Sequence, residues 1–402
     1  MKKFITHCAL RITHCLPAAM IVGSLLSASP VNAEVRNYDG VGEYIMSDFE
    51  TPDVAKQRAK TYAERNAQEK AGVYIKSYSR TENLELVDDE IVTMTSGILK
   101  IISVDYKLVP MEEYGGIMYR ATVLASIDTD KVDSWIAQGV GERESLVEKN
   151  RELQKQIDEQ EKLIERLKAE AAQKKSPEAA EKLKDEFATA DRIFMSNVKL
   201  EEGDRLNLVI ADWAYEEAVK CWTEAIELNP NNFLAYESRG YYFHLPDVAR
   251  YAEAIDDYTH AIKLRPGTAD NYFYRGETYM IIGERELAQK DFERALGLNP
   301  QMSAPLGELA YLYATSGQPQ KAIEFANRAL ETNERNWRAY YSRGLAFFYL
   351  KDFDAALADA QSALDWGCSD AYQLIGDCYA EMGRRDEAEK YWEIAKDPPA
   401  FG

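Results

Sequence analysis

The second half of this 402-residue sequence is organised by small residues that recur at a nearly constant interval. Gly240, Gly276, Ala310, Gly344 and Gly376 follow one another at steps of 36, 34, 34 and 32 residues. Two alanine ladders run in parallel, one through Ala218, Ala254, Ala288, Ala322, Ala356 and Ala388, the other through Ala225, Ala261, Ala295, Ala329, Ala363 and Ala395. A glycine inside a helix costs about 1 kcal/mol relative to alanine, so its recurrence indicates sites where two helices cross too closely for a side chain. The pattern predicts repeated pairs of amphipathic helices.

A 34-residue, two-helix unit with small residues at fixed points resembles the tetratricopeptide repeat family. The resemblance covers residues 189–398, about half of the chain, and Gly203 indicates an additional, more polar unit at its front. It implies a mainly α fold, a right-handed α-solenoid of about six units. Solenoids of this kind present extended surfaces to other proteins, so the resemblance also implies a binding scaffold.

The resemblance implies a set of groove residues as well. In tetratricopeptide arrays the first helix of each unit lines the concave face, at positions one and four residues after the small-residue site and three before it. The candidates for a peptide-binding groove are Glu237, Tyr241, His244, Phe273, Glu277, Met280, Tyr311, Tyr341, Leu345, Phe348 and Asp377. Aromatic and apolar groups thus share a surface with acids, which would select a protein or peptide with basic or amide groups. The alternative is that these side chains pack on one another and fill the groove.

Three of the repeats carry an arginine directly before the repeat glycine and an aspartate at one later position. The pairs are Arg239 with Asp257, Arg275 with Asp291, and Arg343 with Asp359. The two repeats that lack the arginine also lack the aspartate. This joint presence predicts structural ion pairs between helices rather than arginines that bind phosphate.

Residues 34–136 have the pattern of a small α+β domain. Thr51-Pro52 is typical of a helix start, and an alanine every fourth residue from Ala55 to Ala71 gives the helix a smooth stripe that can lie against a sheet. Predicted strands are Val35–Met46, Ile101–Met111 and Ile117–Ile127, the last two joined by a hairpin at Tyr114-Gly115-Gly116.

The segments YDGVGEY, AKQRAKTYAERNAQEKAGVYIKSYS and DDEIVTMTSGILKI of this domain resemble the N-terminal domain of flagellar assembly protein T and related small extracytoplasmic lipoprotein domains. The likeness covers about a quarter of the chain. It implies an envelope-associated binding or assembly domain without known chemistry. A flagellar role does not carry over, because here the domain precedes a repeat array and lacks a lipid-bearing cysteine.

Residues 142–188 are expected to form a helical linker. A heptad fits, with Asn150, Ile157, Ile164 and Ala171 at a, and Leu146, Leu153, Gln160 and Leu167 at d. Isoleucine at a, leucine at d and one asparagine at a favour a parallel two-stranded coiled coil, which would make the protein a homodimer through residues 146–171. A solvated linker helix remains the alternative, and Ser176-Pro177 is expected to break the helix.

The first 33 residues have the features of a secretory signal peptide. Lys2, Lys3 and Arg11 carry its positive charge, the apolar run Ala18–Ala28 is too short to span a bilayer, and small residues end at Ala33, where cleavage is expected. We therefore expect an extracytoplasmic protein, periplasmic or secreted, with no membrane insertion after cleavage. An uncleaved signal anchor is the alternative.

The formal net charge of −20 argues against binding to nucleic acid or to an anionic membrane surface. After cleavage three cysteines remain, Cys221, Cys368 and Cys378, with no CxxC spacing. They are predicted to be buried thiols, with a Cys368–Cys378 bridge as the alternative.

The sequence contains no Gly-rich phosphate loop, no GxSxG and no HExxH motif, so we predict neither an enzyme nor a cofactor or metal site. The leading prediction is an extracytoplasmic scaffold that binds a peptide or protein in the groove of the repeats. The alternative is a structural component of envelope assembly, in which the α+β domain binds the partner and the repeats act as a spacer.

Overall fold

The computed structural model describes residues 35–81, 86–111, 116–128, 132, 140–173, 177–207 and 212–398. These residues form two compact units, one that ends at Asn232 and one that begins at Phe233. The predicted leader and most of the predicted hairpin turn lie outside the described residues.

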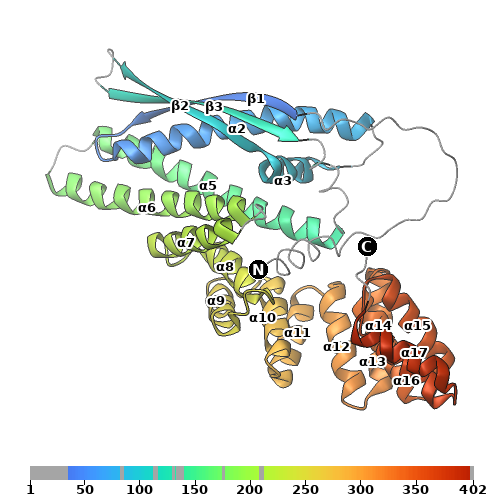
Figure 1. The fold of residues 1–402 in the computed structure, drawn as a ribbon. Coiled ribbons are helices and arrows are strands. Elements are labelled where there is room, and N and C mark those ends of the chain that lie inside the picture. The colour runs from blue at the N-terminus through green and yellow to red at the C-terminus, as the bar shows by residue number, and fades with distance from the viewer. Residues whose placement is uncertain are drawn as a thin grey trace. The chain divides into compact units, whose positions relative to one another are not determined.

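The first unit contains a three-stranded antiparallel sheet (Figure 1). Its strands are β1 (Val35–Met46), β2 (Lys100–Met111) and β3 (Gly116–Asp128), in the order β1-β3-β2. The three predicted strands are therefore present, with ends that differ by at most one residue. Met111 pairs with Gly116, as the hairpin signal predicted.

Helix α2 (Pro52–Thr81) lies along one face of this sheet (Figure 1). The alanine stripe from Ala55 to Ala71 is fully buried, because it faces the strands. Gly40 and Gly42 of β1 complete the contact, since a Cβ on either would collide with backbone carbonyl oxygens of α2. Helix and strand therefore touch backbone to backbone, which only alanine on one side and glycine on the other allow.

Three further helices complete most of this unit: α3 (Asp88–Ile98), α5 (Val140–Gln173) and α6 (Pro177–Asn207). Figure 1 shows α5 and α6 on the side of α2 that faces away from the sheet. Ile164 and Leu167 of α5 and Phe187 of α6 are buried in the same core as α2 and the strands. Residues 142–188 are therefore part of the α+β unit rather than a linker.

The predicted dimer seam needs a correction for the same reason. Leu153, Ile157, Ile164 and Leu167, and also Gln160, are buried within the single chain, so they are not available to a second copy. Asn150, expected to fix the register of a coil, instead donates a hydrogen bond to Thr93 of α3 at 3.3 Å. The side chain of Leu146 lies outside the described residues.

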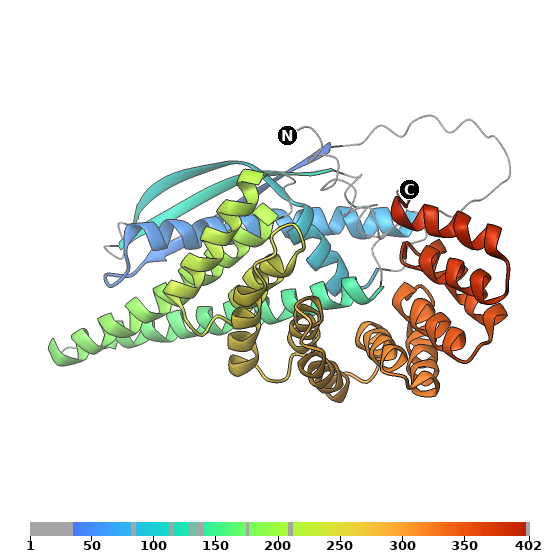
Figure 2. The ribbon, with the colours of Figure 1, turned by 60° about the horizontal axis from the view of Figure 1, so that its bottom comes forward.

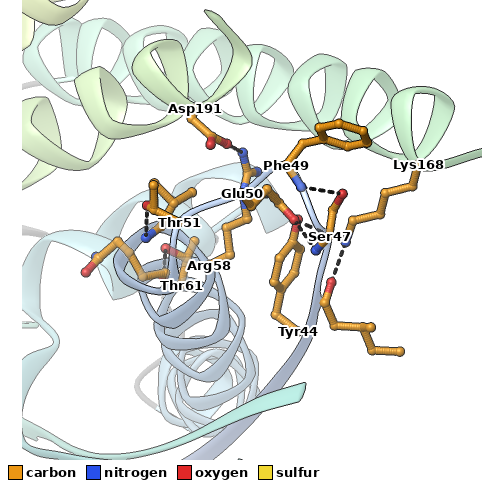
Figure 3. Close-up of polar contacts among 12 residues, drawn as sticks. Tyr44, Ser47, Phe49, Glu50, Thr51, Arg58, Thr61, Lys168 and Asp191 are labelled. Atoms are coloured by element: carbon orange, nitrogen blue, oxygen red, sulfur yellow. Dashed lines mark hydrogen bonds and ion pairs between the residues drawn. The ribbon is translucent and has the colours of Figure 1, made fainter. Parts of the chain in front are cut away.

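A buried ionic cluster joins α2 to α5 and α6 (Figure 3). Arg58 of α2 contacts the carboxylates of Glu50 at 3.3 Å and Asp191 of α6 at 3.0 Å, and its side chain is 3% exposed. The Tyr44 hydroxyl donates to Glu50, and Lys168 of α5 donates to the carbonyl of Ile45 at 2.7 Å. Because four elements contribute to it, the cluster fixes how the long helices cross the domain.

Helix α6 also forms a hairpin with α7 (Asp212–Leu228), which closes the first unit. A Cβ on Gly203 would lie 2.6 Å from the indole nitrogen of Trp222, so glycine is required where these helices cross. The same indole nitrogen donates to Asp204 at 3.0 Å. This is the polar first unit that Gly203 indicated.

The second unit consists, in its described residues, of five helix hairpins that follow one another along the chain (Figure 2). They are α8 (Phe233–His244) with α9 (Tyr251–Leu264), α10 (Ala269–Ile281) with α11 (Arg285–Leu298), α12 (Ser303–Thr315) with α13 (Pro319–Thr332), α14 (Trp337–Tyr349) with α15 (Phe353–Asp365), and α16 (Ala371–Glu381) with α17 (Arg385–Lys396). A Cβ on Gly276 would lie 2.7 Å from the ring of Phe292 in the paired helix. The glycine ladder therefore marks the crossings, as the sequence predicted.

Candidate functional site

The repeat arginines form ion pairs inside single hairpins. Each guanidinium makes two parallel hydrogen bonds to one carboxylate, at 2.7 to 2.8 Å. The pairs are Arg239 with Asp257, Arg275 with Asp291, and Arg343 with Asp359, as the sequence pattern predicted. The aspartates are buried, so these arginines hold two helices together and are not exposed to a ligand.

The first helices of the hairpins carry the predicted groove residues. We call this surface the first-helix face and define it by Glu237, Tyr241, His244, Glu277, Met280, Tyr311, Tyr341, Leu345, Phe348 and Asp377. Tyr241 is exposed, at 41%, and the other members are half-buried. Side chains of neighbouring first helices contact one another along this face.

Phe273 does not belong to the first-helix face. It is only 8% exposed and lies in the hydrophobic core of its own hairpin, with its ring centroid 6.0 Å from that of Phe292. The next residue, Tyr274, is half-buried and contacts α8. The Tyr274 ring meets the Tyr241 ring edge-on, with centroids 5.2 Å apart.

Polar contacts link α8 to α10 across this face. Asn271 of α10 donates its amide hydrogen to the carboxylate of Glu237. The hydroxyl of Thr278 donates to the carbonyl of Tyr274 at 2.7 Å, so its oxygen can only accept from Nδ1 of His244, which lies 2.9 Å away. These two hydrogen bonds assign the proton of a neutral His244 to Nδ1 and leave a lone pair on Nε2.

That lone pair faces a carboxyl group. Nε2 of His244 lies 3.8 Å from Oε2 of Glu277. Burial lowers the pKa of His244, so the imidazole stays neutral near pH 7. Burial, and then the nearby Glu308 carboxylate, raise the pKa of Glu277 to about 8, against a partial opposing effect of Arg338. At neutral pH the proton of this contact therefore lies mostly on Glu277, and both side chains are uncharged.

The centre of the first-helix face contains the arginine that sequence reasoning missed. Arg338 of α14 donates to Glu308 of α12 at 2.7 Å. Its guanidinium also lies 4.4 Å from the ring centroid of Trp337 and 5.1 Å from that of Tyr311. Tyr311 in turn stacks on Tyr341, with centroids 6.3 Å apart. The middle of the face is thus largely satisfied by its own contacts, in line with the alternative that these side chains pack on one another.

The last hairpins use their predicted residues internally as well. Asp377 accepts hydrogen bonds from the amide of Gln373 at 2.9 Å and from the indole nitrogen of Trp392 at 2.8 Å. Phe348 packs against Phe353, with centroids 5.9 Å apart, and Leu345 lines the same core. In the described residues of the second unit, the buried side-chain polar atom without a hydrogen-bond partner is instead the hydroxyl of Tyr258 on α9.

Tyr258 of α9 belongs to that end of the face. It is 1% exposed, stacks on Tyr274 with centroids 6.1 Å apart, and lies close enough to Glu237, Tyr241 and Glu277 for their charges to act on it. Within the described part of the chain its hydroxyl has no hydrogen-bond partner. This environment could not be predicted, because a tyrosine on a second helix has the pattern of a core residue.

The described residues also bear on metal binding, membrane insertion and disulfide formation. No group of three or more His, Cys, Asp and Glu side chains there is arranged to hold a metal ion. No helix in these ranges is long and apolar enough to cross a membrane. Cys221, Cys368 and Cys378 are buried free thiols, so the alternative Cys368–Cys378 bridge is absent.

Comparison with known proteins bears on the repeats. Models of the tetratricopeptide repeat match residues 214–245, 281–334, 308–371 and 369–393. The chain is 24% identical over 183 residues to anaphase-promoting complex subunit 3 of Schizosaccharomyces pombe, and 32% identical over 152 residues to tetratricopeptide repeat protein 6 of Homo sapiens. These alignments cover 45% and 37% of this chain but only 27% and 29% of the relatives.

Among solved structures, one similar protein is described as "YrrB: a TPR protein with an unusual peptide-binding site". It aligns with a TM-score of 0.36 at 24% identity, over 44% of this chain and 92% of that protein. The likeness of residues 34–136 to flagellar assembly protein T stays a prediction. Residues 214–245 and 281–393, where the small-residue ladders predicted helix hairpins, thus match tetratricopeptide repeats, and proteins with such repeats mediate protein–protein interaction.

Proposed function

We propose that this protein is a non-enzymatic scaffold that binds a peptide or protein on the first-helix face, and that the bound segment offers basic or amide groups. The proposal rests on the environment of the Glu277 carboxyl group. This group is half-buried on that face, and its ion-pair contact among the described residues is His244, whose pKa is lowered by burial. A buried carboxyl group without a cationic partner is costly and gains from a ligand that supplies one.

The rest of the face fits such a ligand. Glu237, Glu277 and Glu308 place three acids on neighbouring first helices, and Arg338 pairs with Glu308 at 2.7 Å. Tyr241 adds an exposed aromatic ring beside them. Aromatic anchors with a few polar groups are typical of protein-binding surfaces, and the acidic excess would select basic or amide groups.

A crosslinking pull-down from envelope extract tests this proposal. The test variant combines Tyr241→Ala, Glu277→Gln and Tyr311→Ala, and it leaves out Phe273, whose removal would damage the core. The control combines Leu287→Ala and Glu286→Gln, which change an exposed apolar residue and an exposed acid on α11, the second helix of its hairpin. We expect the test variant to lose its crosslinked partners and the control to keep them, with equal far-ultraviolet circular dichroism. Capture that survives in the test variant would contradict the proposal.

One observation favours the α+β unit as a second candidate for the partner site. β2 is an edge strand, and its Ile102, Tyr106 and Leu108 are about half exposed. Edge strands with exposed apolar residues can accept a further strand from a partner. The double substitution Tyr106→Lys and Leu108→Lys is expected to abolish capture only if this second candidate is right, with the repeats as a spacer.

We propose, from the sequence of residues 1–33, that the mature protein begins near Glu34 outside the cytoplasm. The positive charge, the short apolar run and the small residues before Glu34 support this. Mass spectrometry of the protein from fractionated cells tests it. An intact N-terminus on protein recovered from the cytoplasmic fraction would contradict it.

A further inference from the structure

We infer that the α8–α10 end of the first-helix face contains a subsite for one cationic side chain, a lysine or an arginine, which binds at Glu277. The inference rests on the proposed function and specifies its ligand: a cation, and not merely an amide, is recognised. We define the cation subsite by Glu237, Tyr241, Tyr258, Tyr274 and Glu277.

The charges of the described residues leave room for one cation here. Of the carboxyl groups at the centre of the face, Glu308 is paired with Arg338 at 2.7 Å, and Glu237 accepts from Asn271. Glu277 has neither a guanidinium nor an ammonium group within ion-pair distance among the described residues. An ammonium or guanidinium group from a ligand would supply the missing partner.

Aromatic rings form the walls of the cation subsite. Tyr274 meets Tyr241 edge-on at 5.2 Å and stacks on Tyr258 at 6.1 Å, with an interplanar angle of 14°. Tyr241 is 41% exposed, which leaves part of its ring open to a ligand. Cations bind favourably over tyrosine rings, and the methylene groups of lysine and arginine pack on the same surfaces.

The Tyr258 hydroxyl is an independent sign of a ligand. It is buried, has no hydrogen-bond partner among the described residues, and lies in the electrostatic field of Glu237, Tyr241, Tyr274 and Glu277. A buried hydroxyl without a partner is unfavourable, and such groups are rare in folded proteins. Its oxygen can accept a hydrogen bond from an ammonium or guanidinium group that binds at Glu277.

Binding of the cation is expected to release a proton, because of the groups around Glu277. These are His244 of α8, Tyr258 of α9, Glu308 of α12 and Arg338 of α14, while Glu237, Tyr241 and Tyr274 act on Tyr258. Because burial and Glu308 raise the pKa of Glu277 to about 8, the carboxyl group is mostly protonated at neutral pH. A bound cation favours the ionised carboxylate, so its binding expels this proton. Binding should therefore strengthen as the pH rises toward 8 and then level off.

Short random peptides displayed on phage are the probe, selected on the full chain at a pH of about 8.5. We expect selected peptides to contain a lysine or arginine whose replacement by norleucine weakens binding about tenfold or more. Affinity on the wild-type protein should rise about tenfold per pH unit below the pKa of Glu277. Calorimetry near pH 7 in buffers of different ionisation enthalpy should show release of about one proton.

Two variants and one control separate the parts of this inference. Glu277→Gln, an isosteric mimic of the protonated acid, should remove both the lysine preference and the pH dependence. Tyr258→Phe should weaken binding several-fold and keep the pH dependence, and because it removes an unpaired hydroxyl it should fold at least as stably. Glu293→Gln, on the exposed surface of α11, should change nothing.

The outcomes distinguish this inference from the proposed function. Selected peptides that depend on Tyr241 and Tyr311, yet bind without a cation and without pH dependence, would overturn the cation subsite and leave the first-helix face as the binding surface. Failure to select any peptide that depends on this face would overturn both.

Discussion

Gly276→Ala is expected to destabilise the second unit, although alanine is the better helix former. Alanine gains about 1 kcal/mol of helix propensity over glycine. Its Cβ, however, would lie 2.7 and 2.9 Å from two ring carbons of Phe292 and 3.3 Å from the Cβ of Asp291. Phe292 is fully buried, and Asp291 is held by both hydrogen bonds of Arg275, so neither can move aside cheaply.

The size of the effect follows from these two terms. Overpacking in a core costs about 1–3 kcal/mol, and a contact this short places the strain near the upper end. After the gain in propensity, we expect the free energy of unfolding to fall by about 2 kcal/mol, or about 4–8 °C in melting temperature for a unit of this size. The measurement is urea and thermal unfolding followed by circular dichroism at 222 nm.

Gly297→Ala is the matched control in the same hairpin. Gly297 is in α11, and a Cβ there would meet nothing within 4 Å. The identical substitution should therefore raise the free energy of unfolding by about 0.5–1 kcal/mol. If Gly276→Ala were as stable as the wild-type protein while Gly297→Ala gained stability, close helix crossing would not be the reason for the glycine ladder.

Three further predictions concern other parts of the chain. Arg58→Met leaves the carboxylates of Glu50 and Asp191 buried without their common partner. It should therefore lower the free energy of unfolding, measured by denaturant titration, by about 3–5 kcal/mol. A loss below about 1 kcal/mol would mean that the cluster is dispensable. Ile164→Ala should lower the free energy of unfolding by about 2–5 kcal/mol, since this residue lines a core within one chain. The molar mass measured by light scattering should stay unchanged. If the wild-type protein were a dimer that this variant dissociates, the coiled-coil interpretation would be right. Because the pKa of Glu277 is raised from 4.5 to about 8 in the folded protein, its contribution to stability is fully present below about pH 4.5 and is lost as the pH rises to about 8. The melting temperature of the wild-type protein should therefore fall relative to that of Glu277→Gln across this range, and parallel curves would contradict the raised pKa.

Local spacing was sufficient to predict most of the elements. Gly276 and its equivalents mark real helix crossings, and the alanine stripe of α2 does lie against a sheet. Both patterns indicate that two elements approach each other so closely that only small residues fit between them. That requirement is local and does not depend on the rest of the fold. The repeat ion pairs were predictable for a similar reason, since a buried aspartate cannot persist without its arginine.

The partner of an apolar stripe could not be predicted in this way. Ile157 and Ile164 have the same spacing whether they pack against a second copy of the chain or against their own domain. The heptad pattern indicates only that one face of α5 is buried, not what buries it. Phe273 was misassigned because the repeat position that it shares with Glu237 and Tyr341 is buried in the core of the α10–α11 hairpin, which the spacing does not reveal. Arg338 and Tyr258 were missed because their roles depend on contacts between hairpins, which no spacing within one repeat records.

Helix α6 gives the first unit a mechanical property. Phe187 fixes it in the core of the sheet domain, and Gly203 fixes it against α7. These two points are sixteen residues apart on one uninterrupted helix, or about 24 Å. A helix of this length behaves as a stiff lever arm, so a tilt of about 10° at the sheet displaces the α7 contact by about 4 Å. A partner that moved the sheet domain would thereby move the first hairpin, with no flexible joint between them among the residues of α6.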